Sequence, residues 1–184
     1  MANRTATVAA MAVAAMLAGA HVAGAESSPA ALNLAAERAH VRSGSPAIKA
    51  AIDEAMRRSV TFRALIAAIN ESESYVFVNE GECGHGVRAC FLNVRSSGSF
   101  RFLFVHIDQS RRDLDLMASL GHELRHAIEV IDEPSVRSDS EKFFFYERIG
   151  MRGAGGTRET TAAMDTGNEV RSEISSFNRQ AKPQ

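Results

Sequence analysis

The sequence predicts an α+β fold in which helices precede and follow a small sheet of about three to four strands. Apolar residues recur at spacings of three and four between Pro46 and Ile69, the pattern of amphipathic helices. The stretch from Tyr75 to Ile107 is instead rich in β-branched and aromatic residues. Helical spacing returns over Leu114 to Ile131. Helices and strands thus form separate runs along the chain, which is typical of the α+β class.

The N-terminal 25 residues have the pattern of a secretory signal peptide. Arg4 carries their one positive charge, an Ala/Val/Met run without charge follows, and Ala23-Gly24-Ala25 precedes Glu26. We therefore predict an exported protein, periplasmic or secreted. No later stretch approaches the roughly 20 apolar residues of a membrane span.

One domain is expected in the remaining chain. Removing residues 1–25 from 184 leaves 159 residues, enough for one hydrophobic core. Residues 26–45 are Ala-rich and predicted to be a flexible lead-in, residues 46–178 the domain, and residues 179–184 a frayed tail. With 21 Lys and Arg against 22 Asp and Glu, the net charge of −1 indicates no partner among nucleic acids or anionic membranes.

The first helical stretch begins at Pro46, a residue suited to the first turn of a helix, and Arg57-Arg58-Ser59 is expected to divide it into two helices. Three strands should follow. They are Tyr75–Val78, Ala89–Val94 and Phe100–Ile107, the last two joined as a hairpin through Ser96-Ser-Gly-Ser99. Both faces of the last strand are largely apolar, which predicts a central position or cover on both sides.

Both cysteines, Cys83 and Cys90, lie within eight residues of each other. In an exported protein this spacing predicts a local disulfide. A metal cluster of Cys83, His85 and Cys90 is the weaker alternative, because thiolate zinc sites favour CxxC-like spacings and reducing compartments.

Two further helices are expected after the helix that ends near Ile131. The first covers Ser138–Ile149, a glycine-rich loop covers Gly150–Gly156, and the second covers about Thr157 to Phe177. Acidic residues gather at the end of the preceding helix, where the helix dipole disfavours them, so a metal or an Arg is expected nearby as compensation. These residues are Glu129, Asp132 and Glu133.

The pattern His122-Glu123-Leu-Arg-His126 carries the chemistry. Two histidines four apart on a helix project from the same face and can share one metal ion. The intervening Glu123 is the usual partner of a metal-bound water. Histidine and carboxylate ligands in an open tetrahedral site make zinc the expected metal.

The stretch Leu120-Gly-His-Glu-Leu-Arg-His-Ala-Ile-Glu129, with Glu159-Thr-Thr-Ala-Ala later, resembles the zincin metallopeptidases and, more narrowly, a group of uncharacterised exported bacterial zincin-like proteins. The resemblance implies a zincin-like fold, with the HExxH helix packed beneath a small mixed sheet. It also implies that His122 and His126 bind one Zn²⁺ per chain and that Glu123 polarises the attacking water. A third, downstream residue would complete the site.

The third ligand is expected to be a carboxylate, because no histidine follows His126. Glu159 is preferred, since it starts a predicted helix and matches the Glu-Thr element of the similar proteins. Glu147 and Glu129 are the alternatives. Glu129 lies two turns beyond His122, about 10 Å along the helix axis, so a supporting role or a pair with Arg125 suits it better.

The sequence therefore predicts an exported zinc metallopeptidase that hydrolyses a peptide or protein substrate, with Glu123 as general base. Tyr146, His106 and Arg148 are candidates by residue type for stabilising the oxyanion, and for His106 a place in the core is the favoured interpretation. The alternative is a non-catalytic zincin-like metal-binding or interaction module of the bacterial envelope. A third possibility is an accidental motif on an exported α+β scaffold with one disulfide. The oligomeric state is left open.

Overall fold

The computed structural model describes residues 39–84, 87–109, 114–153 and 156–180. The predicted signal peptide, the first part of the lead-in and residues 181–184 of the tail lie outside this range. The fold is α+β, as predicted, with five helices and a four-stranded mixed sheet in the described residues. In chain order the elements are β1 (Val41–Arg42), α2 (Pro46–Arg58), α3 (Val60–Asn70), β2 (Ser74–Glu80), β3 (Ala89–Ser97), β4 (Phe100–Ile107), α4 (Leu114–Ile131), α5 (Asp139–Ile149), β5 (Met151–Arg152), β6 (Arg158–Glu159) and α6 (Thr161–Gln180).

The main sheet has the strand order β1-β2-β4-β3. Strands β1, β2 and β4 run parallel, and β3 pairs with β4 as an antiparallel hairpin. The predicted hairpin and the central position of Phe100–Ile107 are therefore confirmed. Strand β3 forms one edge of the sheet, and a bulge interrupts its pairing between Phe91 and Asn93.

The flexible lead-in predicted over 26–45 is wrong for its last residues, because β1 belongs to the sheet. Val41 pairs with Val76, whose N–H donates to the carbonyl of His40 at 2.8 Å. A strand of two residues has no periodicity in the sequence, so nothing there distinguished it from a loop.

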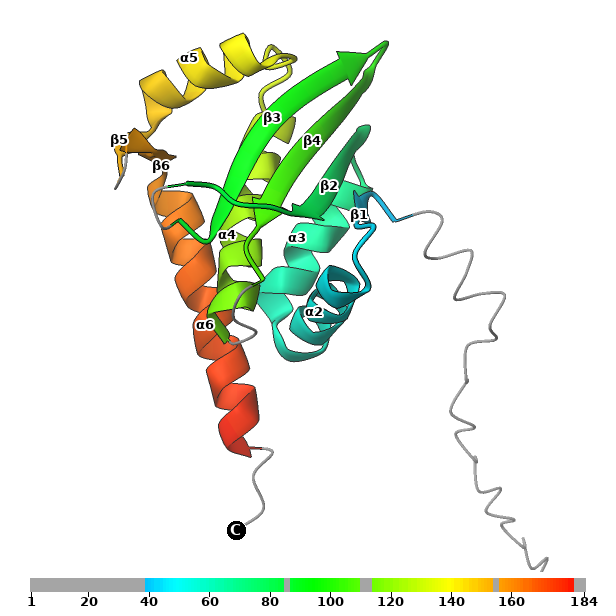
Figure 1. Cartoon of the computed structure of the whole chain (residues 1–184), viewed down its shortest axis with the longest axis vertical. Coiled ribbons are helices and arrows are strands. Elements are labelled where there is room, and N and C mark those ends of the chain that lie inside the picture. Colours follow the sequence, from blue (N-terminus) through cyan, green and yellow to red (C-terminus); the bar gives the residue numbers. More distant parts are fainter. Residues whose placement is uncertain (1–38, 85–86, 110–113, 154–155, 181–184) are drawn as a thin grey trace, which may run out of the picture.

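Helices α2, α3 and α4 lie against one face of the sheet, and α6 packs on α4 (Figure 1). Alternate residues of β2 and β4 face those helices and are fully buried, including Val76, Val78, Leu103 and Val105. The opposite face carries half-buried aromatic rings that stack across the strands, with ring centroids 5.4 Å apart for Phe77 and Phe104. The second apolar face of β4 therefore packs against neighbouring rings of the same sheet.

The predicted break between the first two helices falls at Ser59. Its N–H closes α2 by donating to Ala55, while its side chain accepts from the N–H of Phe62 at 2.9 Å to begin α3. A serine in extended conformation thus caps one helix and ends the other.

The C-terminal part differs from the prediction in its boundaries. The glycine-rich stretch forms a small antiparallel hairpin of β5 and β6, so α6 begins at Thr161 instead of Thr157. Thr160 caps α6 by accepting from the N–H of Ala163 at 3.1 Å. Helix α6 also continues to Gln180, beyond the predicted end of the domain at 178. Among the described helices, none has both the length and the apolar character that crossing a membrane requires.

The sequence predicted a metal or an Arg near the acidic residues at the end of α4. Arg101 is that residue, and the charges of Asp132 and Glu133 act on it. Its side chain is buried beneath the sheet and donates to carbonyl oxygens at the end of α4 and just beyond it. Nη1 lies 2.7 Å from the oxygen of Val130 and 3.0 Å from that of Glu133, and Nη2 lies 2.7 Å from that of Ile131. Burial lowers the pKa of Arg101. A strand of the sheet thereby anchors the end of the helix that carries the motif.

Replacing Arg101 by Met is expected to lower the free energy of unfolding by about 3 kcal/mol, because buried carbonyls lose a charged donor. Urea unfolding followed by circular dichroism measures this change. Arg57→Met serves as the control, since Arg57 is exposed and pairs only within α2. Equal effects of the two substitutions would show that Arg101 does not anchor α4.

Candidate metal site

Helix α4 places His122 and His126 one turn apart in the interior of the molecule. The sequence predicted a helix with one apolar face and the histidines opposite it. In the structure α6 packs on that opposite side, so Gly121, Glu123 and His126 are all buried. His122 stays half-buried, with 20% of its side chain exposed.

Two glycines let α4 and α6 approach this closely. A Cβ on Gly121 would lie 2.8 Å from Cγ2 of Val170, and one on Gly167 would lie 3.2 Å from Cβ of His122. Side chains at either position would push the helices apart. Both glycines therefore serve the close packing of the two helices, and α6 continues through Gly167.

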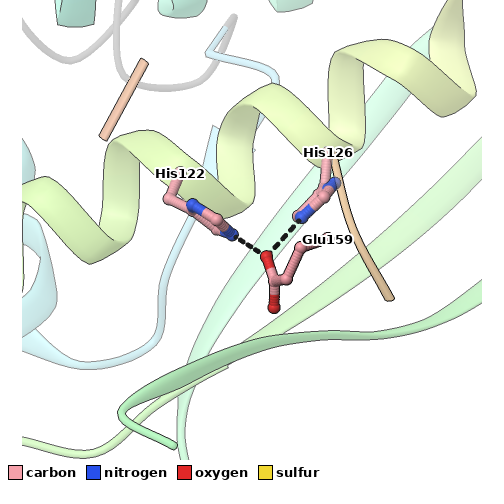
Figure 2. A group of neighbouring side chains, drawn as sticks. All are labelled: His122, His126 and Glu159. Carbon is pink, nitrogen blue, oxygen red and sulfur yellow. Dashed lines mark ion pairs between the residues drawn. The ribbon is translucent and has the colours of Figure 1, made fainter. Parts of the chain in front are cut away.

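Glu159 completes a group of three ligand atoms with the two histidines (Figure 2). Its Oε2 atom lies 2.8 Å from Nε2 of His122 and 3.5 Å from Nε2 of His126. The three ligand atoms all lie within 4.8 Å of one another. Glu159 stands in β6, just before α6, and not in the first turn of a helix as predicted. The hairpin β5–β6 therefore carries the carboxylate to the histidine pair.

The surroundings of Glu159 fit a bound cation. Its Oε2 is buried, and the approach of His122 has the distance but not the geometry of a hydrogen bond, so no donor satisfies this oxygen. The histidines His122 and then His126 are the main causes that lower the pKa of Glu159. A buried carboxylate oxygen and two imidazole nitrogens that converge on one point match the donor set of a zinc ion.

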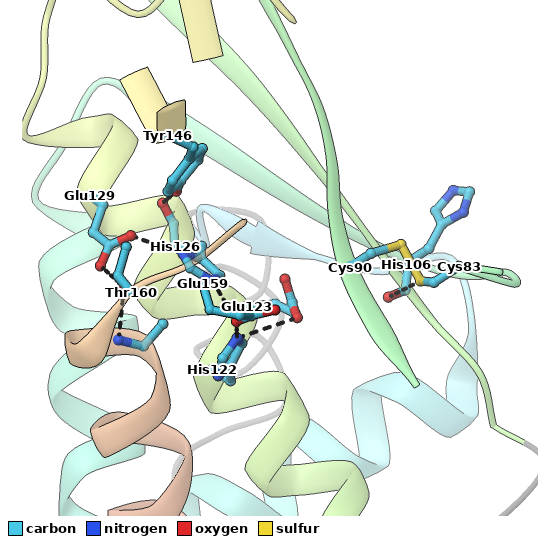
Figure 3. Close-up of polar contacts among 11 residues, drawn as sticks. Cys83, Cys90, His106, His122, Glu123, His126, Glu129, Tyr146, Glu159 and Thr160 are labelled. Carbon is cyan, nitrogen blue, oxygen red and sulfur yellow. Dashed lines mark hydrogen bonds and ion pairs between the residues drawn. A yellow bond between two sulfur atoms is a disulfide. The ribbon is translucent and has the colours of Figure 1, made fainter. Parts of the chain in front are cut away.

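Glu123 points into the same site from α4 (Figure 3). Its Oε1 lies 4.0 Å from Nε2 of His122, and only 6% of the residue is exposed. Burial raises the pKa of Glu123, and the neighbouring His126 and His122 oppose this rise. A carboxylate with a raised pKa is suited to accept a proton and release it again.

Glu129 supports His126 from behind. Its Oε2 lies 2.8 Å from Nδ1 of His126, and its Oε1 accepts from the hydroxyl of Thr160 (Figure 3). Burial raises the pKa of Glu129, but the hydrogen bonds from His126 and Thr160 outweigh burial and lower it. An ionised carboxylate only accepts, so Nδ1 of His126 carries the proton and Nε2 faces Glu159. The supporting role predicted for Glu129 agrees with this contact.

Burial and the carboxylates of Glu129 and Glu159 determine the pKa of His126. Burial lowers the pKa of His126, but contacts with Glu129 and Glu159 outweigh burial and raise it to about 9. The carboxylates thus stabilise a positive charge at this position. Tyr146 adds a hydrogen bond from its hydroxyl to the carbonyl of His126 at 2.9 Å, which fixes the backbone of the motif.

Substituting Glu129 by Ala is expected to weaken zinc binding by about 10-fold to 100-fold, because His126 loses the acceptor that orients its ring. Competition with a chromophoric chelator measures the affinity. Asp132→Ala is the matched control, since Asp132 is exposed just beyond the end of α4. An unchanged affinity in Glu129→Ala would mean that the ring is oriented by packing alone.

The remaining predicted candidates lie elsewhere. Glu147 is 38% exposed and accepts from Nε of Arg158 at 2.7 Å, outside the ligand group. Arg148 is exposed and pairs with Glu133. His106 lies on the outer face of the sheet opposite Cys90, half-buried, so its predicted place in the core is wrong. Of the three oxyanion candidates only Tyr146 borders the site.

Cys83 and Cys90 form the predicted disulfide. It lies on the far side of β3 from the histidines (Figure 3), and both ends of the loop that it closes are tied to the sheet. His85, the third member of the alternative metal cluster, lies outside the described residues. The residues just before Cys90 line the candidate site, so the disulfide holds the rim of the cleft.

Two cavities meet at the ligand group. One, of about 360 Å³, lies between α4 and α6 and reaches Arg88 and Arg171. The other, of about 240 Å³, lies on the His126 side between β3 and α5. Val87, Ala89, Glu123 and Glu159 line both cavities. The site is therefore the middle of a cleft with two arms.

Sequence reasoning missed two residues of this cleft. Lys142 reaches from α5 to the carbonyl oxygens of Phe91, at 3.0 Å, and of Leu92. Thr160 bonds Glu129 across 31 positions of sequence. Neither residue stands in a motif, and each acts through a partner that only the folded chain brings near.

The ligand pattern is short. Two ligands stand in one pentapeptide, and the third follows 33 positions after His126, at Glu159. Such a pattern specifies a kind of chemistry more closely than it specifies ancestry. Comparison of the chain with family models, with curated proteins and with solved structures finds no match.

Proposed function

We propose that this protein is an exported zinc-dependent metallopeptidase with a zincin-like fold. The observation that carries the proposal is the convergence of His122, His126 and Glu159 within 4.8 Å, with the buried Glu123 beside them. Three protein ligands and a neighbouring carboxylate are the parts of a catalytic zinc site. The signal-peptide pattern and the disulfide support export.

His122, His126 and Glu159 would hold the ion, and Glu129 would keep Nε2 of His126 directed toward it. A zinc ion held by these three residues would supply a Lewis acid that activates a water molecule. Glu123 would accept the proton of that water and return it to the nitrogen of the leaving amine. Its burial, which raises its pKa, favours this return.

Strand β3 is the element on which a peptide substrate would lie. It is an edge strand, and its first residues line both arms of the cleft. Backbone groups at a sheet edge can pair with an extended peptide and hold the scissile amide near the ligand group. The substrate is therefore expected to be a peptide or an unfolded segment of a protein.

Metal content and hydrolysis of a peptide mixture, measured together on the purified mature chain, test the proposal. We expect one zinc per chain and cleavage products in mass spectra, both removed by a chelator and both restored by zinc. Zinc without any cleavage would favour the alternative, a non-catalytic metal-binding module. No zinc in a folded protein under zinc-replete conditions would leave only an exported scaffold.

A further inference from the structure

The two arms of the cleft differ in volume and in the elements that bound them. The arm between α4 and α6 has the larger volume, about 360 Å³. The arm on the His126 side has about 240 Å³ and is bounded by α5, which crosses over the edge of β3. A peptide that passes the ligand group can thus extend along the first arm, while the second arm has room for about one large residue.

Helix α5 blocks the sheet edge at Phe91. The carbonyl of Phe91 accepts from Nζ of Lys142 at 3.0 Å. Further along β3, the N–H of Val94 donates to Asp139 at 2.8 Å. An extended peptide that pairs with β3 therefore meets occupied backbone groups from Phe91 onward. Its chain has to end in the second arm.

The charges of this arm indicate which end of a peptide fits. Among the described residues, the carboxylates that line it are Glu123 and Glu159, which belong to the metal site. Two cations, Lys142 and Arg158, line it as well, and Arg158 is paired with Glu147.

Lys142 is half-buried and makes no ion pair with any residue of the described chain. Its ammonium group is held by the carbonyls of Phe91 and Leu92 and lies 4.8 Å from the centre of the Phe91 ring. Neutral acceptors fix the position of this charge without neutralising it. Asp139 and Glu123 act on this charge without forming an ion pair with it. An anion that entered the arm could pair with it directly.

The rest of the arm is apolar. The rings of Phe91, Phe143 and Tyr146 line it, and Phe143 is 56% exposed. Exposed aromatic surface beside a cleft marks a place where an apolar group binds. The arm thus combines an apolar wall with Lys142, a cation that has no ion-pair partner among the described residues.

We propose that the second arm binds the C-terminal residue of a peptide, with an apolar side chain among these rings and its α-carboxylate at Lys142. The inference rests on the proposed peptidase function and makes the enzyme a carboxypeptidase. The last amide bond breaks, the hydroxyl of water joins the acyl carbon, and the proton goes to the nitrogen of the released amino acid. Lys142 is then a residue that determines specificity.

Two peptides that differ only in their C-terminal group test this assignment. Acetyl-Ala-Ala-Phe with a free carboxylate and the same peptide as a C-terminal amide are incubated with the zinc-loaded mature protein, and products are followed by mass spectrometry. We expect release of Phe from the acid, with a kcat/KM at least about 10-fold above that for the amide.

Lys142→Gln is expected to lower kcat/KM for the acid by about 10-fold to 100-fold, mainly through KM, and to leave the amide unchanged. Lys142→Arg should restore part of the loss, and Lys49→Gln, on the exposed surface of α2, should change neither rate. A structural defect at the bulge of β3 would instead lower both rates equally. That result would overturn the role of Lys142.

The failures of the two proposals are distinguishable. Equal cleavage of acid and amide, or cleavage at internal bonds of longer peptides, would overturn the carboxypeptidase assignment and leave the peptidase function standing. Absence of cleavage of every peptide by the zinc-loaded protein would remove both.

Discussion

Replacing Glu123 by Gln is expected to leave zinc binding intact and to lower the rate of peptide hydrolysis by about a thousandfold. The substitution keeps the shape of the side chain, but an amide cannot take a proton from water. General base catalysis typically contributes between about 10²-fold and 10⁴-fold to a rate. Because Glu123 lies outside the ligand group, the site should hold its ion as before.

Two measurements on the same preparation distinguish a general base at position 123 from a metal ligand or a structural support. Zinc per chain is measured by elemental mass spectrometry, and kcat/KM is measured with the peptide that the wild type cleaves best. Glu173→Gln offers a matched control, since Glu173 on α6 caps α3 through Ser59 and Thr61, away from the cleft. Full activity of Glu123→Gln would rule out Glu123 as the general base, and loss of zinc would make it a ligand or a structural support.

The local part of the site was predictable because it depends on one helix. His122, Glu123 and His126 stand in a single turn, and the spacing of apolar residues over Leu114–Ile131 indicated a helix whose described bounds agree with it. The helix breaks at Ser59 and after Ile131 were also visible, since capping and turn residues act within a few positions. These features need no knowledge of distant contacts.

The position of Glu159 depends on the whole C-terminal half. The hairpin β5–β6 and the close crossing at Gly121 and Gly167 bring its carboxylate to the histidines. The preference for Glu159 over Glu147 came from its place at the start of a predicted helix and from the resemblance, and the structure puts Glu159 in β6 instead. Strand pairs of two residues give no periodic signal, which is also why β1 was missed.

Burial of Glu123, His126 and Glu129 in α4 was not predictable for a related reason. The pattern of α4 contains polar residues on the face where α6 packs, and these residues are buried because they satisfy one another. Glu129 takes hydrogen bonds from His126 and Thr160, and Arg101 satisfies carbonyls at the end of the helix. A stripe of polar residues on a helix predicts a solvent-exposed face unless the groups that bond to it are known. Thr160 and Arg101 each lie about 30 positions away from the residues to which they bond.

Removing one ligand at a time is expected to weaken zinc binding by about two to three orders of magnitude for His122→Ala, His126→Ala and Glu159→Ala alike. Structural zinc sites with four ligands have binding free energies of about 10–16 kcal/mol, so each ligand contributes about 2.5–4 kcal/mol. Each 1.4 kcal/mol corresponds to about a factor of ten in affinity. Competition with a chromophoric chelator at fixed pH measures these losses.

The free energy of unfolding of the metal-free variants should separate the three ligands. His126→Ala leaves the buried Glu129 without its principal donor, so we expect it to destabilise the metal-free protein by about 2 kcal/mol. Glu159→Ala removes a carboxylate oxygen that no donor satisfies, so its metal-free form should lose less stability. Glu147→Ala is the control, and it should keep the zinc affinity of the wild type. Wild-type zinc affinity in Glu159→Ala, or weaker zinc binding by Glu147→Ala, would show that the third ligand is a residue other than Glu159.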